Sequence, residues 1–143
     1  MPVIERTFWV KAPIEKVFAL LADHSKDPDW LPGLVESRNF QGQGLGATWE
    51  WTYKMAGISF HGTGQVVEHD PPRRHVVETK GGATSTWAWT LEPEGEGTKV
   101  HLRLEYSIPV AVLGKVAEKL LLAQNEKAAD EGAANLKRIL EDK

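Results

Sequence analysis

Hydrophobic residues follow two different periods along this chain. From residue 34 to residue 108 apolar and polar residues alternate, and this period of two places successive side chains on opposite faces of a β-strand. The pattern is clearest near the end, where every second residue from Val100 to Ile108 is apolar. Glycine and proline turns interrupt the alternation, so we predict six strands joined as antiparallel hairpins. They span residues 34–40, 47–55, 58–69, 73–80, 83–92 and 98–108.

The two ends of the chain carry helical patterns, except for one further strand predicted at residues 4–11. Pro13 then suits the first turn of a helix, in which Ile14, Phe18 and Leu21 follow at helical spacing. A second short helix through Trp30 ends at Pro32-Gly33. From Val110 to about Glu141 the apolar residues recur at helical spacing, which predicts one helix about 45 Å long. Gly132 within it indicates close packing or a local bend.

These elements predict an α+β helix-grip fold. A curved seven-stranded antiparallel sheet would wrap around the long C-terminal helix, with two short helices between strands 1 and 2. The length of 143 residues fits a single domain over residues 1–143. One helix does not fill the concave side of seven strands, so we expect space between the helix and the sheet.

Aromatic residues occupy alternate positions in two of the predicted strands. Trp49, Trp51 and Tyr53 share one face of their strand, and Trp87 and Trp89 share one face of theirs. Two interpretations stay open: an ordinary packed core, or a wall that leaves room for a ligand. Ligand pockets are mostly apolar with a few polar groups, and indole N–H groups would supply such polar contacts.

Composition narrows the classes of function. The chain has no cysteine, which excludes disulfides, thiolate metal sites and cysteine nucleophiles. The net charge of -3, without a basic cluster, argues against nucleic acid as a partner. We also expect no signal peptide, no stable membrane insertion, no cofactor and no metal, and hence a cytoplasmic protein. The sequence leaves open whether it is a monomer or a homodimer.

Several segments along the chain resemble one superfamily. They are the strand, Ala12-Pro13 and helix of residues 10–18, the Trp30-Leu31-Pro32-Gly33 turn, the hairpin of residues 64–74 with Pro71-Pro72, the hairpin of residues 89–98, and the helix end at residues 134–141. In these the chain resembles the START-like, helix-grip (SRPBCC) superfamily, and within it the small bacterial polyketide cyclase/dehydratase-like proteins. The resemblance covers nearly the whole chain, but it rests on turn and packing positions, which specify fold better than function.

The resemblance implies three kinds of function. The first is binding of a small hydrophobic molecule, such as a lipid, a polyketide or an aromatic metabolite, in a cavity between the sheet and the C-terminal helix. The second is a polyketide cyclase/dehydratase-like enzyme that positions its substrate, with a tyrosine or histidine giving acid–base help. The third is an interaction domain like that of the Hsp90 activators. No nucleophile, phosphate-binding or metal motif separates these.

Candidate site residues follow from the predicted inner face of the sheet and the apolar stripe of the long helix. As catalytic candidates we take Tyr106 and His61, although His61 faces outward if Phe60 faces inward. His24 and His75 are expected to be exposed near element ends, and Asp27 to be solvated or capping. Trp30 would lie over one mouth of the cavity, where it could gate entry. The predicted ligand-binding residues are Trp30, Trp49, Trp51, Tyr53, Phe60, Trp87, Trp89, Leu104, Tyr106, Leu113, Leu120 and Gln124.

Overall fold

A computed structural model describes residues 3–55, 57–82, 84–107 and 110–141. Within these, the side chains of Met55, Ile58, residues 110–122 and Gln124 lie outside the described part. The elements in chain order are β1 (Val3–Val10), α1 (Ile14–Ala22), the 3-10 turn η1 (His24–Lys26), α2 (Asp27–Trp30), β2 (Leu34–Gln41), β3 (Thr48–Met55), β4 (Ile58–Asp70), β5 (Arg74–Gly81), β6 (Thr84–Glu94), β7 (Gly97–Ser107) and α3 (Val110–Glu141).

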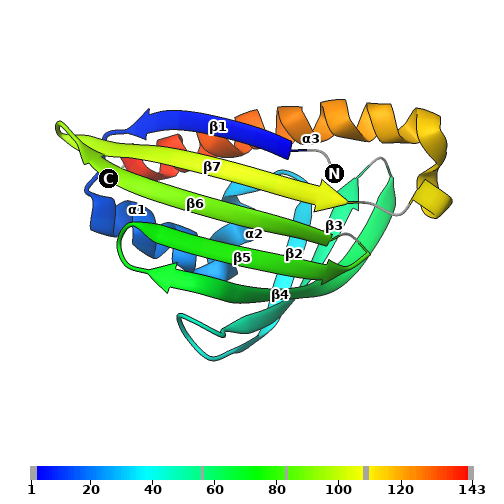
Figure 1. Ribbon diagram of the computed structural model, residues 1–143, viewed down its shortest axis with the longest axis horizontal. Helices are drawn as coiled ribbons and strands as arrows, with labels where there is room; N and C mark the ends of the chain where they lie inside the picture. The colour runs from blue at the N-terminus through cyan, green and yellow to red at the C-terminus, as the bar shows by residue number, and fades with distance from the viewer. Residues whose placement is uncertain (1–2, 56, 83, 108–109, 142–143) are drawn as a thin grey trace.

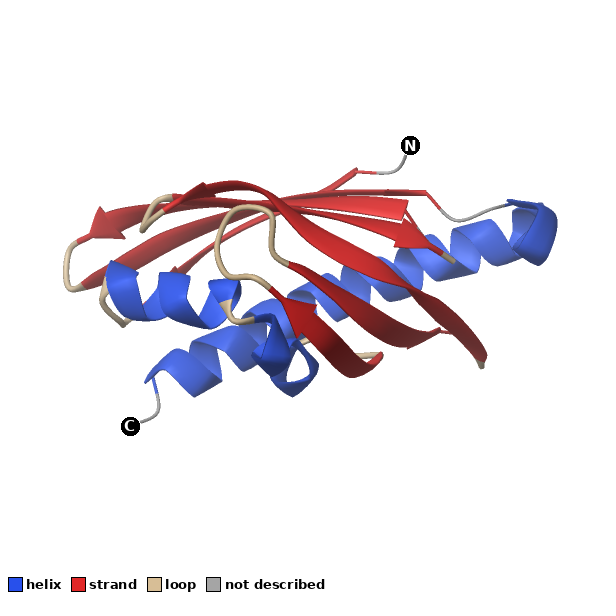
Figure 2. Cartoon of the chain, turned by 90° about the horizontal axis from the view of Figure 1, so that it is seen from below, coloured by secondary structure: helices blue, strands red, loops and turns tan. Residues whose placement is uncertain are grey.

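The seven strands form one antiparallel sheet in the order β1-β7-β6-β5-β4-β3-β2. Strands β2 to β7 therefore follow one another as a meander, and β1 joins the open edge of β7 (Figure 1). All the helices lie on one side of this sheet, with α3 running along its length (Figure 2). The predicted helix-grip α+β fold is confirmed, including the short helices between the first two strands.

Strand register decides which residues share the helix-facing side of the sheet, called the inner face here. In the β5–β6 hairpin Trp87 pairs with Val77 and Trp89 pairs with His75, so His75 lies on the same face as the tryptophans. Between β4 and β5 the register shifts after Val66, where Glu68 rather than Val67 pairs with Val76. Such a bulge adds one residue to one strand and reverses the alternation beyond it.

The core on the inner face consists of two clusters. One joins β1, β6 and β7 to α1 and the second half of α3, and it includes Val10, Leu91 and Leu136. The other lies on β3, β4 and β5 around Trp49 and Trp51. Trp87 packs against both clusters, so the boundary between them falls at the middle of the sheet.

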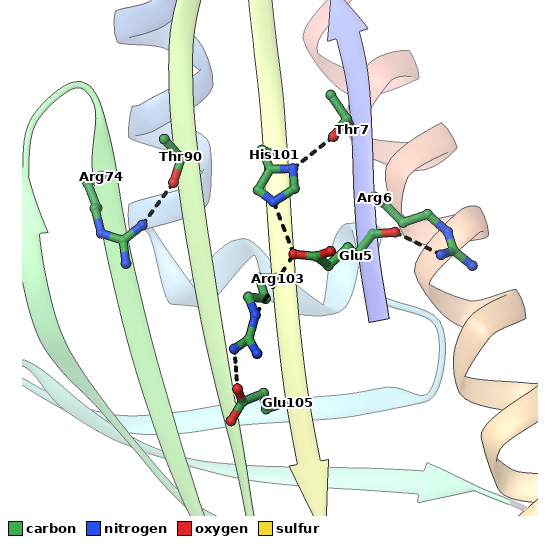
Figure 3. Close-up of polar contacts among 8 residues, drawn as sticks. All are labelled: Glu5, Arg6, Thr7, Arg74, Thr90, His101, Arg103 and Glu105. Carbon is green, nitrogen blue, oxygen red and sulfur yellow. Dashed lines mark hydrogen bonds and ion pairs between the residues drawn. The ribbon is translucent and has the colours of Figure 1, made fainter. Parts of the chain in front are cut away.

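Polar and charged residues cover the other side of the sheet. Across β1 and β7, His101 bonds to Thr7 through Nδ1 at 2.8 Å, and Arg103 lies between the carboxylates of Glu5 and Glu105 (Figure 3). These side chains are partly exposed to water. One sheet thus has an apolar inner face and a charged outer face, as expected for an antiparallel sheet covered on one side.

Helix α3 contacts the short helices through Trp30. A Cβ atom on Gly132 would approach the Trp30 ring to 3.4 Å, so glycine lets the indole pack directly against the α3 backbone. Asn135 Nδ2 donates a hydrogen bond of 3.0 Å to the Trp30 carbonyl. The close packing expected at Gly132 is therefore present. Within the described residues, no helix has the length and apolar character needed to cross a bilayer.

Candidate functional site

A cavity of about 140 Å³ lies between the sheet, the short helices and α3. Its walls are mainly aromatic and aliphatic, and five of the six tryptophans line it. The lining residues are Leu21, His24, Asp27, Trp30, Leu31, Leu34, Trp49, Trp51, Tyr53, Val77, Thr79, Ser85, Trp87, Trp89, Leu104, Tyr106, Asn125, Ala128 and Ala129. An apolar cavity of about 150 Å³ holds one benzene ring, so this volume suits a compact molecule.

Glycines in β4 set the position of two of these tryptophans. Trp49 pairs with Gly64 and Trp51 pairs with Gly62 across the β3–β4 hairpin. A Cβ atom on Gly64 would come within 2.6 Å of the Trp49 ring, and one on Gly62 within 2.5 Å of the Trp51 ring. The two indoles therefore lie over strand positions that carry no side chain. The absence of a Cβ atom there allows each ring to pack directly against the β4 backbone.

Trp30 closes the cavity on the side of the short helices. It is buried, and its ring meets Trp87 and Trp89 edge-on, at centroid distances of 6.3 and 5.7 Å. Edge-to-face geometry of this kind is favourable for aromatic pairs. With Gly132 behind it, Trp30 is held between α3 and the sheet. A gating role for Trp30 stays a prediction.

Three histidines and an aspartate form a hydrogen-bonded chain at one end of the cavity. Asp27 Oδ2 lies 2.7 Å from His24 Nδ1, and His24 Nε2 lies 3.0 Å from His75 Nε2. The other nitrogen of His75, Nδ1, lies 3.1 Å from His69 Nδ1. His24, His75 and Asp27 are buried, and only His69 is partly exposed. We name this set the histidine chain.

Aromatic rings enclose the histidine chain on two sides. The His24 ring stacks on Trp49 with a centroid distance of 3.9 Å and an angle of 10°. From α1, the Phe18 ring meets His69 at 5.2 Å and His75 at 5.7 Å. The chain therefore runs from the cavity wall, between these rings, to the loop that joins β2 and β3, where Gly44 lies against the His69 ring.

Burial shifts the pKa values of two members of the histidine chain, His75 and Asp27. The pKa of His75 falls to about 3, first because burial disfavours its charged form and then because His24 and His69 repel a charge there. The pKa of Asp27 is raised because burial disfavours the carboxylate, although the bond from His24 opposes this effect. His75 is thus a neutral imidazole near pH 7, and Asp27 holds its proton more tightly than an exposed aspartate.

Some buried polar atoms at the cavity have no hydrogen-bond partner among the described residues. They are Asp27 Oδ1 and the indole nitrogens of Trp30 and Trp51. The Trp30 N–H also acts on Asp27 as a hydrogen-bond donor and lowers its pKa, although the contact falls short of full hydrogen-bond geometry. Buried polar groups are usually satisfied, so an acceptor and donors that lack a full hydrogen bond in an apolar cavity provide contacts for an incoming molecule.

The sequence-predicted site residues fall into four groups. Trp30, Trp49, Trp51, Tyr53, Trp87, Trp89, Leu104 and Tyr106 all line the cavity. Phe60 is buried on the inner face with Trp49 and Trp51 but is not a lining residue. His61 is exposed on the outer face, where its Nδ1 bonds to Thr52 at 3.0 Å. The side chains of Leu113, Leu120 and Gln124 lie outside the described residues.

Three expectations about polar residues were wrong. His24 and His75 were expected to be exposed, yet they are 9% and 1% exposed. Asp27 was expected to be solvated or capping, yet it is buried and bonded to His24. The capping role belongs to Asp23, whose carboxylate accepts a bond from the backbone N–H of Ser25. The polar residues at the cavity that the sequence analysis missed are therefore the members of the histidine chain.

The reason for these errors differs between the histidines. His75 had a misleading signal: a two-residue turn at Gly81-Gly82 would pair residue 75 with Ala88, whereas the observed β5–β6 register pairs it with Trp89 on the inner face. His69 had no usable signal, because strict alternation from Phe60 points residue 69 outward, and only the β4 bulge turns it inward. His24 lies at a turn between helices, where no period predicts the direction of a side chain.

A sequence model of one protein family matches residues 1–141 of this chain. The family is described as polyketide cyclase / dehydrase and lipid transport. The chain belongs to this family. No curated protein sequence matches it.

Solved structures of the same fold include proteins with related descriptions. TTHA0849 from Thermus thermophilus is 21% identical with a TM-score of 0.83, covering 96% of this chain and 95% of that protein. The di-domain ARO/CYC StfQ of the steffimycin biosynthetic pathway is 15% identical with a TM-score of 0.77, covering 98% of this chain and 50% of that protein. The ZhuI aromatase/cyclase from Streptomyces sp. R1128 is 18% identical with a TM-score of 0.72, covering 96% of this chain and 94% of that protein. At these identities the likeness shows the shared fold alone.

Proposed function

We propose that the protein binds a compact hydrophobic molecule that carries a ring and a hydroxyl group, in the cavity between the sheet and α3. The observation that carries this proposal is the combination of five cavity-lining tryptophans with the Asp27 carboxyl in the same wall, whose Oδ1 makes no full hydrogen bond among the described residues. The family, described by polyketide cyclisation, dehydration and lipid transport, and the aromatase/cyclases of the same fold support a hydrophobic ligand.

Cavity size favours a small ligand over a long one. Pockets for drug-sized molecules measure about 300–1,000 Å³, whereas this cavity measures about 140 Å³. A single aromatic ring fills such a space, while a long acyl chain exceeds it. Among the hydrophobic ligands that the sequence suggested, an aromatic metabolite therefore fits better than a lipid.

The polar atoms of the wall favour an oxygen substituent on that ring. Asp27 Oδ1 is an acceptor and would take the hydrogen of a ligand hydroxyl, while the Trp30 and Trp51 N–H groups would donate to a ligand oxygen. Leaving such groups unpaired costs about 1–3 kcal/mol each, so a phenol-like ligand gains where a plain hydrocarbon does not. We expect phenols to bind more tightly than benzene or toluene.

Tryptophan fluorescence tests this proposal directly, because all but one of the tryptophans line the cavity. In a Trp9→Phe background, which removes the outer-face indole, we would titrate phenol, benzene and a long-chain fatty acid. Phenol should change the emission at the lowest concentration, the fatty acid least. Absence of any change with phenol or benzene up to their solubility would refute the binding proposal.

Asp27→Asn and Glu50→Gln form a matched pair for the polar contact. Both substitutions replace a carboxylate by its amide, but Glu50 lies on the outer face and bonds to Asn39. Asp27→Asn should weaken phenol binding about tenfold, the effect of one hydrogen bond, and leave benzene binding unchanged. Equal losses for phenol and benzene would show that Asp27 supports the cavity without contacting the hydroxyl.

The buried His24–Asp27 pair favours a second candidate function, acid–base catalysis on a bound polyketone. Burial raises the pKa of Asp27, as suits a general base, and His24 holds this carboxyl through Oδ2 in the cavity wall. Both nitrogens of His24 are already bonded, to Asp27 and to His75, so in this function Asp27 takes a proton from the substrate carbon through Oδ1 and returns it to the leaving or forming hydroxyl, as cyclisation or loss of water requires.

Turnover of a short synthetic polyketone tests the second candidate. Removal of a general base costs about 100-fold or more in rate, so Asp27→Asn should show at least that loss. Glu50→Gln on the outer face is the matched control and should keep the wild-type rate. Tyr106→Phe tests the tyrosine in the same assay. A wild-type rate in Asp27→Asn would remove that residue from the mechanism.

A further inference from the structure

We propose that the cavity carboxyl of Asp27 exchanges its proton with solvent along the histidine chain, through His24, His75 and His69. The proposal concerns the wall of the ligand site of the preceding section, but the proton path is present in the protein without a ligand and can be tested there. It rests on three consecutive hydrogen bonds that connect a buried carboxyl with a partly exposed ring.

An ionised Asp27 fixes every hydrogen in the chain. A carboxylate only accepts, so His24 must donate from Nδ1 to Asp27 Oδ2. A neutral His24 then accepts at Nε2 from the Nε2–H of His75. His75 in turn accepts at Nδ1 from the Nδ1–H of His69. All three bonds therefore point in the same direction, toward Asp27, and His69 keeps an acceptor lone pair at Nε2.

Adding one proton at the outer end reverses the whole chain. The proton binds to His69 Nε2, and the Nδ1 proton of His69 passes to His75 Nδ1. The Nε2 proton of His75 passes to His24 Nε2, and the Nδ1 proton of His24 passes to Asp27 Oδ2. The result is a neutral carboxylic acid and three neutral imidazoles of opposite tautomer. One proton has been gained, and nothing is oxidised or reduced.

The surroundings match what such a path needs at each end. His75 in the middle is 1% exposed and stays neutral in both states, so no charge has to rest on this buried ring. At the inner end burial raises the pKa of Asp27, and the like charge of Asp23 adds a smaller effect of the same sign, while His24 and Trp30 oppose both. At the outer end His69 is partly exposed, and a Cβ atom on Gly44 would lie 3.4 Å from its Nε2.

The same histidines are not arranged as a metal site. Both nitrogens of His75 are directed at other histidines, so the three rings form a line rather than a cage around one point. Among the described residues no group of three histidine or acidic side chains is placed to hold a metal ion. A line of donors and acceptors transfers protons, whereas a metal site needs lone pairs that converge.

Nitrogen NMR of the protein tests the proposal without any ligand. In mildly alkaline solution the ¹⁵N shifts should show hydrogen on Nδ1 of His24, Nε2 of His75 and Nδ1 of His69. On acidification all three tautomers should reverse together in one transition. Separate transitions for the three rings, or hydrogen on His75 Nδ1 at alkaline pH, would overturn the proposal. His61 and His101 provide internal controls in the same spectra, because they bond to threonines on the outer face.

Two variants keep the test independent of whether a buried substitution folds. Asp27→Asn removes the carboxylate that takes up the proton and should abolish the joint reversal; its persistence would contradict the path. His69→Gln changes only the partly exposed end. It should slow solvent exchange of the His24 Nδ1 hydrogen about tenfold, because loss of one hydrogen bond raises the free-energy barrier to exchange by about the energy of that bond. His101→Gln is the matched control. An equal exchange rate in His69→Gln and wild type would place the proton path elsewhere, whatever the outcome of the ligand titrations.

Discussion

The described histidines divide between the two faces of the sheet, and their settings are opposite. His61 and His101 lie on the outer face, each bonded to a threonine and surrounded by charged side chains and water. His69 and His75 lie on the inner face, bonded to each other and, through His24, to a buried aspartate. The same residue type is a surface polar group in one setting and part of a closed network in the other.

The comparison teaches that the effect of a polar residue depends on what else can satisfy it. Water can replace a lost partner on the outer face, where screening also weakens charge pairs. No water replaces a lost partner in the histidine chain without opening the core, because aromatic rings enclose it. Inner-face substitutions should therefore have larger effects than outer-face ones, and the following predictions rank them from largest to smallest.

Truncation of an inner tryptophan should have the largest effect. Trp89 is 3% exposed and Trp9 on the outer face is 37% exposed. Trp89→Ala should lower the free energy of unfolding by about 3–5 kcal/mol, the cost of a large cavity in a packed core. Trp9→Ala loses one hydrogen bond to the Glu94 carbonyl and partial packing, so we expect about 1–2 kcal/mol. Urea denaturation measures both; similar losses would contradict the contrast between the faces.

A methyl group beneath Trp49 should have the next largest effect. Gly64→Ala places a Cβ atom 2.6 Å from a ring that is itself stacked on His24. A shift of the ring would break its stacking on His24, so we expect a loss of about 1–3 kcal/mol, as for other overpacked cores. Thr63→Ala on the neighbouring outer-face position should change stability by less than about 0.5 kcal/mol. An unchanged unfolding midpoint in Gly64→Ala would show that Trp49 is loosely held.

Acid should destabilise the protein through the inner face. The folded pKa of His75, about 3, lies below its ordinary value of 6.5, so between these values the unfolded chain binds a proton that the folded protein does not. Stability is therefore complete above about pH 6.5 and falls as the pH drops toward 3. The raised pKa of Asp27 acts in the opposite sense, because the folded protein keeps that proton longer as the pH rises.

Thermal denaturation across this pH range checks the sign. His75→Gln should flatten the loss of melting temperature below about pH 6.5, and Asp27→Asn should steepen it, because the opposing contribution of the carboxyl is gone. His101→Gln on the outer face is the control. A wild-type pH profile in His75→Gln would assign the acid sensitivity to another group.

Charge pairs on the outer face should matter least. Arg103 lies between Glu5 and Glu105 in a partly exposed ladder. Arg103→Ala should cost less than about 1 kcal/mol, and the difference from wild type should shrink as salt is added. A salt-independent loss of several kcal/mol would mean that the outer face is not the tolerant one.

The sequence predicted the fold more completely than the site, and the reason is periodicity. Alternation in β7 and β3 and the helical stripe of α3 are each repeated over many residues, so a single irregular position does not obscure them. The aromatic wall of the cavity was predictable for the same reason, because Trp49 and Trp51 are two residues apart in one strand and therefore share a face. The histidine chain depends instead on local features that occur once and are not repeated along a strand.

These local features are the register of the β5–β6 hairpin and the bulge in β4. His75 belongs to the inner face only because the β5–β6 register places it opposite Trp89. His69 joins it only because β4 gains one residue at Val67, and alternation alone places it on the outer face. A local irregularity of this kind leaves no period in the sequence, so the partner of His24 could not be identified before the strands were aligned.

The glycine positions of β4 bear on how this cavity could accept other molecules. Trp49 and Trp51 lie over glycines of β4, so each indole occupies space that no other side chain of that strand fills. A smaller residue at either position would deepen the cavity by nearly the volume of an indole while every strand keeps its place. The size of molecule that the fold accepts would then be adjustable one residue at a time, independently of the polar end that holds Asp27.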